Sequence, residues 1–279
     1  MKSVVLLTLA LFFAATVHGE TTEPRRIVSG SGSLTEIVYA LDAEDRLVAV
    51  DTTSVFPEEA MKLPKIGYAR ALSAEGILSM NPDLLLITDE AGPTAVVDQL
   101  RGAGLPMVEV EEYHTVEGVR QKIRQVAEAL GEAEVGAELL KAFDQQMRTV
   151  EAQRAEAPEA TALFLFAAGG GSPMAAGNGT AGDSVLELAG FENVMNEYAG
   201  YKPVSAEAIV GKNPDWIITT TRTVEGIGGL ESMLSEPGLA ATEAAEEEQV
   251  IVVNDSMLLN FGPRLPKALQ ALLEPRLKE

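Results

Sequence analysis

One segment of this chain occurs twice, and this repeat constrains the fold more than any other feature. Residues 73–88, SAEGILSMNPDLLLIT, match residues 205–220, SAEAIVGKNPDWIITT, with identical Ser, Ala, Glu, Ile, Asn, Pro, Asp and Thr in register. A solenoid would need several adjacent copies, whereas these two are far apart. The repeat therefore indicates two similar lobes.

Each copy of the repeat predicts a short helix followed by a buried strand. Ser73 and Ser205 are candidates to cap a helix start, because a serine oxygen can accept a free amide of the first turn. The helix must end before the shared Asn-Pro pair, because proline disfavours a helical residue before it. The runs 84–88 and 216–220 are continuously apolar, which is typical of parallel strands covered on both faces.

The rest of the chain shows the same alternation of strand and helix patterns. Further strands are expected near residues 25–29, 47–50, 107–110, 163–166 and 250–253, and helices at 34–41, 94–103, 181–188 and 266–277. The glycine-rich turns 30–33 and 177–180 precede two of these helices. Such turns can hold anions, but without a full dinucleotide fingerprint or a lysine we expect tight strand-to-helix turns. The alternation predicts an α/β fold with mainly parallel sheets.

A long helical pattern separates the two halves. Residues 115–156 carry helical apolar spacing, interrupted at Gly131. A helix of about 22 residues after that glycine extends roughly 33 Å, enough to pass from one lobe to the next. We therefore expect a βα lobe over 20–114, a rigid helical bridge over 115–156 that limits lobe closure, and a second βα lobe over 157–279.

The first 19 residues predict export. A basic start and the apolar run 4–15 precede small residues, a pattern typical of a secretory signal peptide and too short to span a bilayer comfortably. The chain has no cysteine, so it lacks a thiol for lipid attachment, and we expect a free periplasmic protein. Its net charge of −21 disfavours nucleic-acid partners.

Four segments resemble one family of transport proteins. Residues 67–79, 169–177, 200–205 and 261–266 together are similar to the periplasmic haemin-binding proteins of bacterial haem ABC importers, within the cobalamin and siderophore binding-protein group. The resemblance covers essentially the whole mature chain. It implies a class III periplasmic binding-protein architecture, with two βα lobes joined by one long bridging helix and a ligand cleft between them. Sheets of this kind bind ligands beyond the carboxyl ends of their strands.

The resemblance implies that Tyr68 is an axial ligand of ferric haem iron. Tyrosine is a known haem ligand, and a phenolate oxygen suits ferric iron. Arg70 is expected either to help Tyr68 ionise or to pair with a haem propionate, since its planar fork matches a carboxylate. The alternative is that Tyr68 is a half-buried packing residue.

Further cleft contacts are expected from the second lobe. Some family members supply a histidine there, but the only histidine of the mature chain is His114 in the first lobe. A position at the rim of the cleft is plausible for His114, but we expect it to be exposed. We therefore expect one protein ligand, with water, Met174 or nothing opposite; Tyr201 is a weaker candidate ligand. The predicted haem, propionate or cleft contacts are Arg70, Met174, Tyr201, Arg222, Met257, Phe261 and Arg264. For Arg222 and Arg264 the alternative is an ordinary surface salt bridge.

The repeated glutamates, Glu75 and Glu207, have two interpretations. By family resemblance, each docks into a basic pocket of a membrane permease, and two equivalent carboxylates suit a permease dimer with two equivalent sockets. Alternatively, both only compensate the dipole of the helix that they begin.

The sequence thus predicts a monomeric binding protein that captures haem and delivers it to an ABC permease dimer in the inner membrane. Capture of cobalamin or a ferric siderophore is the alternative, and it would not need Tyr68 or Arg70. An enzyme is disfavoured, because the chain lacks cysteine and any recognisable nucleophile–base spacing. A zinc or manganese binder is disfavoured, because such sites favour histidine clusters.

Overall fold

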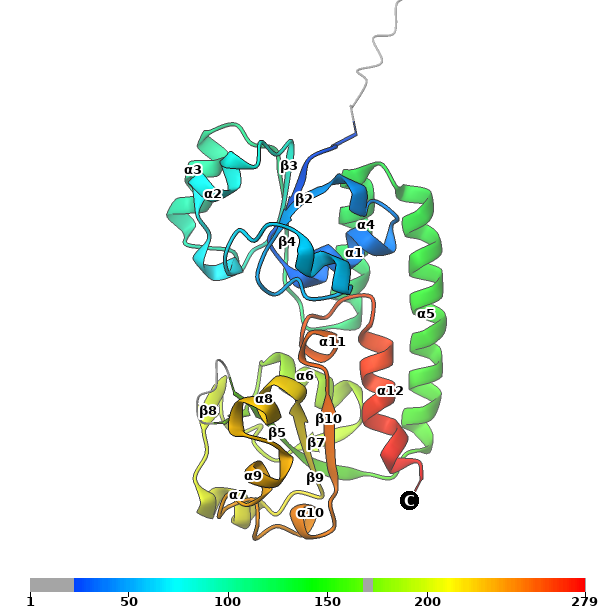
Figure 1. Cartoon of the computed structure of the whole chain (residues 1–279). Helices are drawn as coiled ribbons and strands as arrows, with labels where there is room; N and C mark the ends of the chain where they lie inside the picture. Colours follow the sequence, from blue (N-terminus) through cyan, green and yellow to red (C-terminus); the bar gives the residue numbers. More distant parts are fainter. Residues whose placement is uncertain (1–22, 168–172, 279) are drawn as a thin grey trace, which may run out of the picture.

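The computed structural model describes residues 23–167 and 173–278, which form two α/β lobes joined by a long helix (Figure 1). The predicted signal peptide, residues 1–19, lies outside the described residues, as do residues 169–172 of the glycine-rich turn at 169–177. In the part of the chain that is described, no helix is long and apolar enough to cross a membrane.

The N-terminal lobe is built on a four-stranded parallel sheet in the order β2-β1-β3-β4. Its strands are β1 (Ile27–Ser29), β2 (Leu47–Val50), β3 (Leu84–Thr88) and β4 (Met107–Val110). Every residue of β3 is buried, as its continuous apolar run predicted. Leu84 and Leu86 contact one apolar cluster and Leu85 and Ile87 another, so both faces of the sheet are covered.

Helices cover the two faces of this sheet in pairs. Helices α1 (Gly32–Ala40) and α4 (Val116–Leu130) pack together on one face, and α2 (Ala74–Ser79) and α3 (Thr94–Gly102) on the other. Three short 3-10 helices, η1 (Glu44–Arg46), η2 (Glu58–Lys62) and η3 (Ala69–Ala71), lie in the connections.

The C-terminal lobe contains a mixed sheet in the order β10-β9-β5-β6-β8, with β7 also paired to β5. Its strands are β5 (Ala160–Phe166), β6 (Met174–Ala176), β7 (Phe191–Asn193), β8 (Tyr201–Pro203), β9 (Trp216–Thr220) and β10 (Val250–Val253). Strands β10, β9, β5 and β7 are parallel, whereas β6 and β8 run antiparallel to their neighbours. The mainly parallel sheets are as predicted, with this antiparallel edge added.

Seven helices complete the described part of this lobe. They are α6 (Ala181–Leu188), α7 (Ala206–Lys212), α8 (Thr221–Ile227), α9 (Leu230–Leu234), α10 (Glu243–Glu246), α11 (Asp255–Leu259) and α12 (Leu265–Arg276). Helix α11 contacts α6 and α12 and lies at the side of the lobe that faces the N-terminal lobe (Figure 1).

The sequence repeat corresponds to a structural repeat, α2-β3 and α7-β9. The Ser73 hydroxyl accepts the Gly76 N–H at 3.2 Å, and the Ser205 hydroxyl accepts the Ala208 N–H at 3.2 Å, so both predicted caps are confirmed. The shared asparagine after each helix has positive φ, 48° in the first copy and 38° in the second. This left-handed residue lets the chain leave each helix and enter the buried strand.

Helix α5 (Ala133–Glu156) connects the lobes. Its 24 residues extend about 36 Å at 1.5 Å per residue. Helix α4, which falls inside the predicted bridge, packs on α1 and β4 of the N-terminal lobe, while α12 packs beside α5 (Figure 1). One apolar cluster includes side chains of both lobes, α5 and α12, so the lobes share a continuous core.

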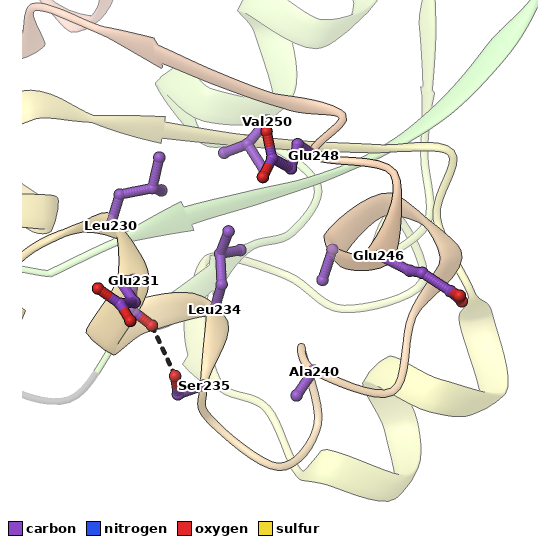
Figure 2. A pocket seen from close by; sticks show the side chains of 9 residues that line it. Leu230, Glu231, Leu234, Ser235, Ala240, Glu246, Glu248 and Val250 are labelled. Atoms are coloured by element: carbon purple, nitrogen blue, oxygen red, sulfur yellow. Dashed lines mark hydrogen bonds between the residues drawn. The ribbon is translucent and has the colours of Figure 1, made fainter.

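A hollow with a volume of about 880 Å³ lies on the C-terminal lobe between α9, α10 and β10 (Figure 2). Its floor includes Leu234 and Val250, and its rim carries Glu231, Glu246 and Glu248. Helices α9 and α10 are at the end of this lobe that is remote from the N-terminal lobe (Figure 1). The hollow is therefore separate from the predicted haem site.

Candidate functional site

Tyr68 and Arg70 lie on a loop at the carboxyl edge of the N-terminal sheet. After β2 the chain returns so that Lys65 bridges Val50 in parallel, and the Thr52 N–H donates to the Gly67 carbonyl at 2.9 Å. The Gly92 N–H, just after β3, donates to the Ala69 carbonyl at 2.9 Å. These bonds fix the loop beyond the carboxyl ends of β2 and β3, where α/β sheets bind ligands.

The two side chains meet at this edge. The Arg70 Nη1 donates to the Tyr68 Oη at 2.7 Å, and the Arg70 Nη2 forms an ion pair with Glu90, which follows β3. Burial lowers the pKa of Arg70, but the Glu90 carboxylate and the Tyr68 oxygen outweigh burial and raise that pKa above its ordinary value. Tyr68 is 43% exposed, so its phenol is held by a cation and still open to a ligand.

His114 follows β4 at the same edge. Its ring packs on Phe261 of the opposite lobe, with centroids 5.0 Å apart and planes inclined by 49°. Burial lowers the pKa of His114, and the Lys122 and Arg70 charges lower it further against the opposing effect of Glu90. The expectation that His114 is exposed was wrong, because its ring packs on Phe261 of the second lobe and the residue is partly buried.

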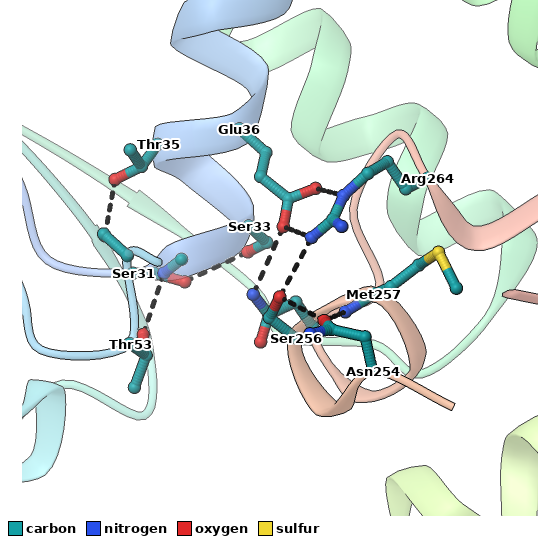
Figure 3. Close-up of polar contacts among 12 residues, drawn as sticks. Ser31, Ser33, Thr35, Glu36, Thr53, Asn254, Ser256, Met257 and Arg264 are labelled. Carbon is teal, nitrogen blue, oxygen red and sulfur yellow. Dashed lines mark hydrogen bonds and ion pairs between the residues drawn. The ribbon is translucent and has the colours of Figure 1, made fainter. Parts of the chain in front are cut away.

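The lobes meet beside His114 through a set of buried polar residues that we call the interlobe junction: Glu36, Glu112 and Lys122 from the first lobe, with Asn260, Phe261 and Arg264 from the second. The Glu36–Arg264 ion pair crosses between the lobes, whereas the Lys122–Glu112 ion pair lies within the first lobe. Lys122 is completely buried, pairs with Glu112, and donates to the Phe261 carbonyl at 3.2 Å. Glu36 accepts two bonds from the Arg264 guanidinium, at 2.8 and 2.6 Å (Figure 3). This fork arrangement fixes orientation as well as distance.

Burial dominates the electrostatics of the interlobe junction. It raises the pKa of Glu36 and of Glu112, although Arg264 and Lys122 oppose it, and it lowers the pKa of Lys122. Each buried charge is therefore stabilised by its ion-pair partner: Glu36 by Arg264 of the other lobe, and Lys122 by Glu112 of the same lobe. Sequence reasoning missed these pairs, because a pattern gives no sign that residues 228 positions apart, Glu36 and Arg264, come together.

The junction engages two of the predicted haem contacts. The Arg264 side chain is only 14% exposed and bonds to Glu36. Its guanidinium carbon lies 3.6 Å from the centroid of the Phe56 ring. Phe261 is fully buried, so it presents no surface to a ligand in this structure. Both residues therefore contact the first lobe: Arg264 contacts Glu36 and Phe56, and Phe261 packs on His114.

Arg222 and Met257 lie at the carboxyl edge of the C-terminal sheet. Arg222 is in the first turn of α8, directly after β9, and pairs with Asp255 at 3.2 Å while its side chain stays 56% exposed. Met257 is half-buried on α11, which follows β10 (Figure 3). Both therefore lie at the ligand-binding edge of their sheet.

Tyr201 and Met174 lie on the antiparallel strands of this lobe. The Tyr201 hydroxyl accepts the Gly182 N–H at 3.1 Å at the start of α6, and its ring packs 5.5 Å from the Phe166 ring. Burial raises the pKa of Tyr201, which opposes formation of a phenolate. Met174 begins β6 opposite Phe166 and is half-buried.

Glu75 and Glu207 are exposed in the first turns of α2 and α7. Hydrogen bonds from its own amide and from Ser205 lower the pKa of Glu207. Both carboxylates are on the surface, away from the ion pairs described above.

Two stiffly connected α/β lobes with polar groups at facing sheet edges define a substrate-binding protein rather than an enzyme. Residues 27–257 match the family model described as periplasmic binding protein, and the chain belongs to this family. The predicted family and class III architecture are therefore confirmed.

Two solved structures are closely similar to this chain. The periplasmic haem-binding protein BhuT, solved in complex with two haems, is 37% identical with a TM-score of 0.85, and the match covers 91% of this chain and 98% of BhuT. The periplasmic haem-binding protein RhuT from Roseiflexus sp. RS-1, in its apo form, is 34% identical with a TM-score of 0.87 and the same coverage.

Two curated relatives are more distant. The ABC transporter substrate-binding lipoprotein YvrC of Bacillus subtilis is 28% identical, over 90% of this chain and 80% of YvrC. The vitamin B12-binding protein of Pectobacterium atrosepticum is also 28% identical, over 89% of this chain and 87% of the relative. The relatives thus include binders of two different tetrapyrrole-type ligands.

Proposed function

We propose that this protein captures ferric haem between its lobes, with Tyr68 as the axial iron ligand, and delivers it to an ABC permease dimer. The observation that carries the proposal is the exposed Tyr68 phenol with Arg70 bonded to its oxygen, at the carboxyl edge of the sheet. The identities of 37% and 34% to two haem-binding proteins support the same ligand.

The chemistry of the Tyr68–Arg70 pair suits ferric haem. A phenolate is a hard oxygen donor, and tyrosine serves as a haem ligand. The Arg70 guanidinium, 2.7 Å from the phenol oxygen, compensates negative charge on that oxygen, and Glu90 holds the guanidinium in place. Arg70 also remains partly exposed, so a propionate could share its fork.

The second lobe supplies the other contacts in this proposal. Arg222 offers an exposed guanidinium for a propionate, and Met257 and Met174 offer apolar surface. Arg264 and Phe261 act indirectly, by fixing the lobe that carries Met257. We divide the chain into a first lobe (20–114), a helical bridge (115–156) and a second lobe (157–279). Helix α4 belongs to the bridge segment of the sequence but packs on the first lobe.

We also propose that the protein is monomeric and free in the periplasm. Its family is periplasmic, whereas the relative YvrC is a lipoprotein. Lipid attachment of that kind uses a cysteine thiol, and this sequence contains no cysteine. Glu75 and Glu207 are the proposed permease contacts.

A ferric haemin titration tests the assignment of Tyr68. The variants are Tyr68→Phe and, as a matched control, Tyr198→Phe, because Tyr198 is 42% exposed and lies on the other lobe. We expect a saturable Soret shift with a phenolate charge-transfer band in the wild type and in Tyr198→Phe, and loss of the band in Tyr68→Phe. An unchanged band and affinity in Tyr68→Phe refutes the role of this residue.

Cobalamin is the second candidate ligand, favoured by the vitamin B12-binding relatives. We rank it below haem, because those relatives are 28% and 27% identical and because cobalamin gives the Tyr68–Arg70 pair no role. Saturable binding of cyanocobalamin without binding of haemin reverses this order.

A further inference from the structure

Two exposed apolar side chains occupy the same position in the structural repeat. Leu78 on α2 is 36% exposed and Val210 on α7 is 42% exposed, five residues after Ser73 and Ser205 respectively. The isoleucine before each, Ile77 and Ile209, is buried. Both copies of the repeat therefore have a buried isoleucine followed by an exposed apolar residue.

Each exposed apolar residue lies beside an exposed carboxylate. Leu78 follows Glu75 by three positions, and Val210 follows Glu207 by three positions. Residues three apart are neighbours on one face of a helix. Each lobe thus presents the same two-part surface, one carboxylate next to one apolar side chain, and we call these surfaces the α2 patch and the α7 patch.

The molecule holds these two patches in a fixed relation. Helix α5, the shared apolar core, the Glu36–Arg264 ion pair and the hydrogen bond from Lys122 to the Phe261 carbonyl all connect the lobes. A surface that occurs twice on one rigid molecule is complementary to a partner that offers the same socket twice, as a two-fold symmetric dimer does.

We propose that the α2 and α7 patches each dock on one subunit of the permease dimer through a two-part contact. The glutamate pairs with a basic side chain, and Leu78 or Val210 fills an apolar hollow beside that base. The exposed carboxylate of each patch favours a basic partner group, and an apolar contact that excludes water strengthens an adjacent ion pair. This inference rests on the proposed function and adds Leu78 and Val210 to it.

The test measures binding to the haem importer of the source bacterium, its permease dimer with the ATPase subunits, reconstituted in nanodiscs. The variants are Leu78→Asn and Val210→Thr. Matched controls are Leu230→Asn and Val252→Thr, because Leu230 is 37% and Val252 39% exposed outside both patches. Binding is measured with and without ferric haemin.

We expect each patch variant to raise the Kd about tenfold, the double variant to raise it further, and both controls to leave it unchanged. Patch variants that bind like the controls overturn the proposal, and so does a wild-type protein that does not bind the importer. All four positions are exposed, so unchanged thermal unfolding is expected and confirms that the variants are folded.

The haemin titration of the same variants separates this proposal from the proposed function. Normal haemin binding combined with unchanged docking refutes only the two-part contact. Absent haemin binding by the wild type, combined with weaker docking of the patch variants, refutes haem capture and supports the docking surface.

Discussion

Replacing Glu112 by glutamine tests how strongly the buried Lys122–Glu112 ion pair of the interlobe junction stabilises the fold. Lys122 has no exposed side-chain surface, and the Glu112 side chain is only 10% exposed. The variant leaves the lysine ammonium buried without a counter-charge, facing only neutral acceptors: the glutamine carbonyl oxygen and the Phe261 and Asn260 carbonyls. Removing one partner of a buried ion pair costs about 3 to 5 kcal/mol.

The assay is urea unfolding at neutral pH, with calorimetry for the melting temperature. A loss of about 3 kcal/mol or more and a fall in Tm of roughly 10 °C are expected for a chain of this size. The matched control is Glu138→Gln, because the Glu138–Lys141 side chains are 75% and 74% exposed. An exposed pair contributes about 0 to 1 kcal/mol. Equal, small losses in the two variants refute the reasoning, since Lys122 would then be as well solvated as Lys141.

Three further predictions address the repeat, the sheet edge and the haem site. Ser205→Ala removes the cap of α7 and is expected to lower the free energy of unfolding by about 1 kcal/mol, measured by urea unfolding; no loss contradicts the cap. Burial and the Lys122 and Arg70 charges lower the pKa of His114 below 6.5, so the unfolded chain binds that proton first as the pH falls. The free energy of unfolding should therefore fall as the pH drops below about 6.5, and His114→Gln should flatten this part of the profile; parallel profiles contradict the shift. Arg70→Ala removes the cation bonded to the Tyr68 oxygen and is expected to weaken ferric haemin binding about tenfold in a Soret titration, whereas unchanged binding contradicts its role.

Much of the fold was predictable from local sequence. The Ser73 and Ser205 caps, the buried strands that follow them and the long α5 helix all depend on residues close together in the chain. Strands β6 and β8 were not predicted. Each has only three residues, too few for an apolar pattern, and they are held by antiparallel pairing to each other and to β5.

The candidate site was predictable in its first-lobe part. The segment around Tyr68 and Arg70 is local, and the structure brings these two side chains into contact. The interlobe junction was not predictable, because Lys122 meets Phe261 across 139 positions and neither residue carries a local signal of the other. The propionate contact of Arg264 stays a prediction, and in the structure a buried carboxylate from the other lobe, Glu36, binds this guanidinium.

A parallel titration of the wild-type protein with ferric haemin and with cyanocobalamin tests the central claim most directly. Both ligands are followed by absorption under the same conditions, and the titration also gives the number of haems bound. We predict saturable haemin binding with the charge-transfer band of a phenolate ligand, and no saturable binding of cyanocobalamin. Saturable binding of cyanocobalamin, with none of haemin, contradicts the account.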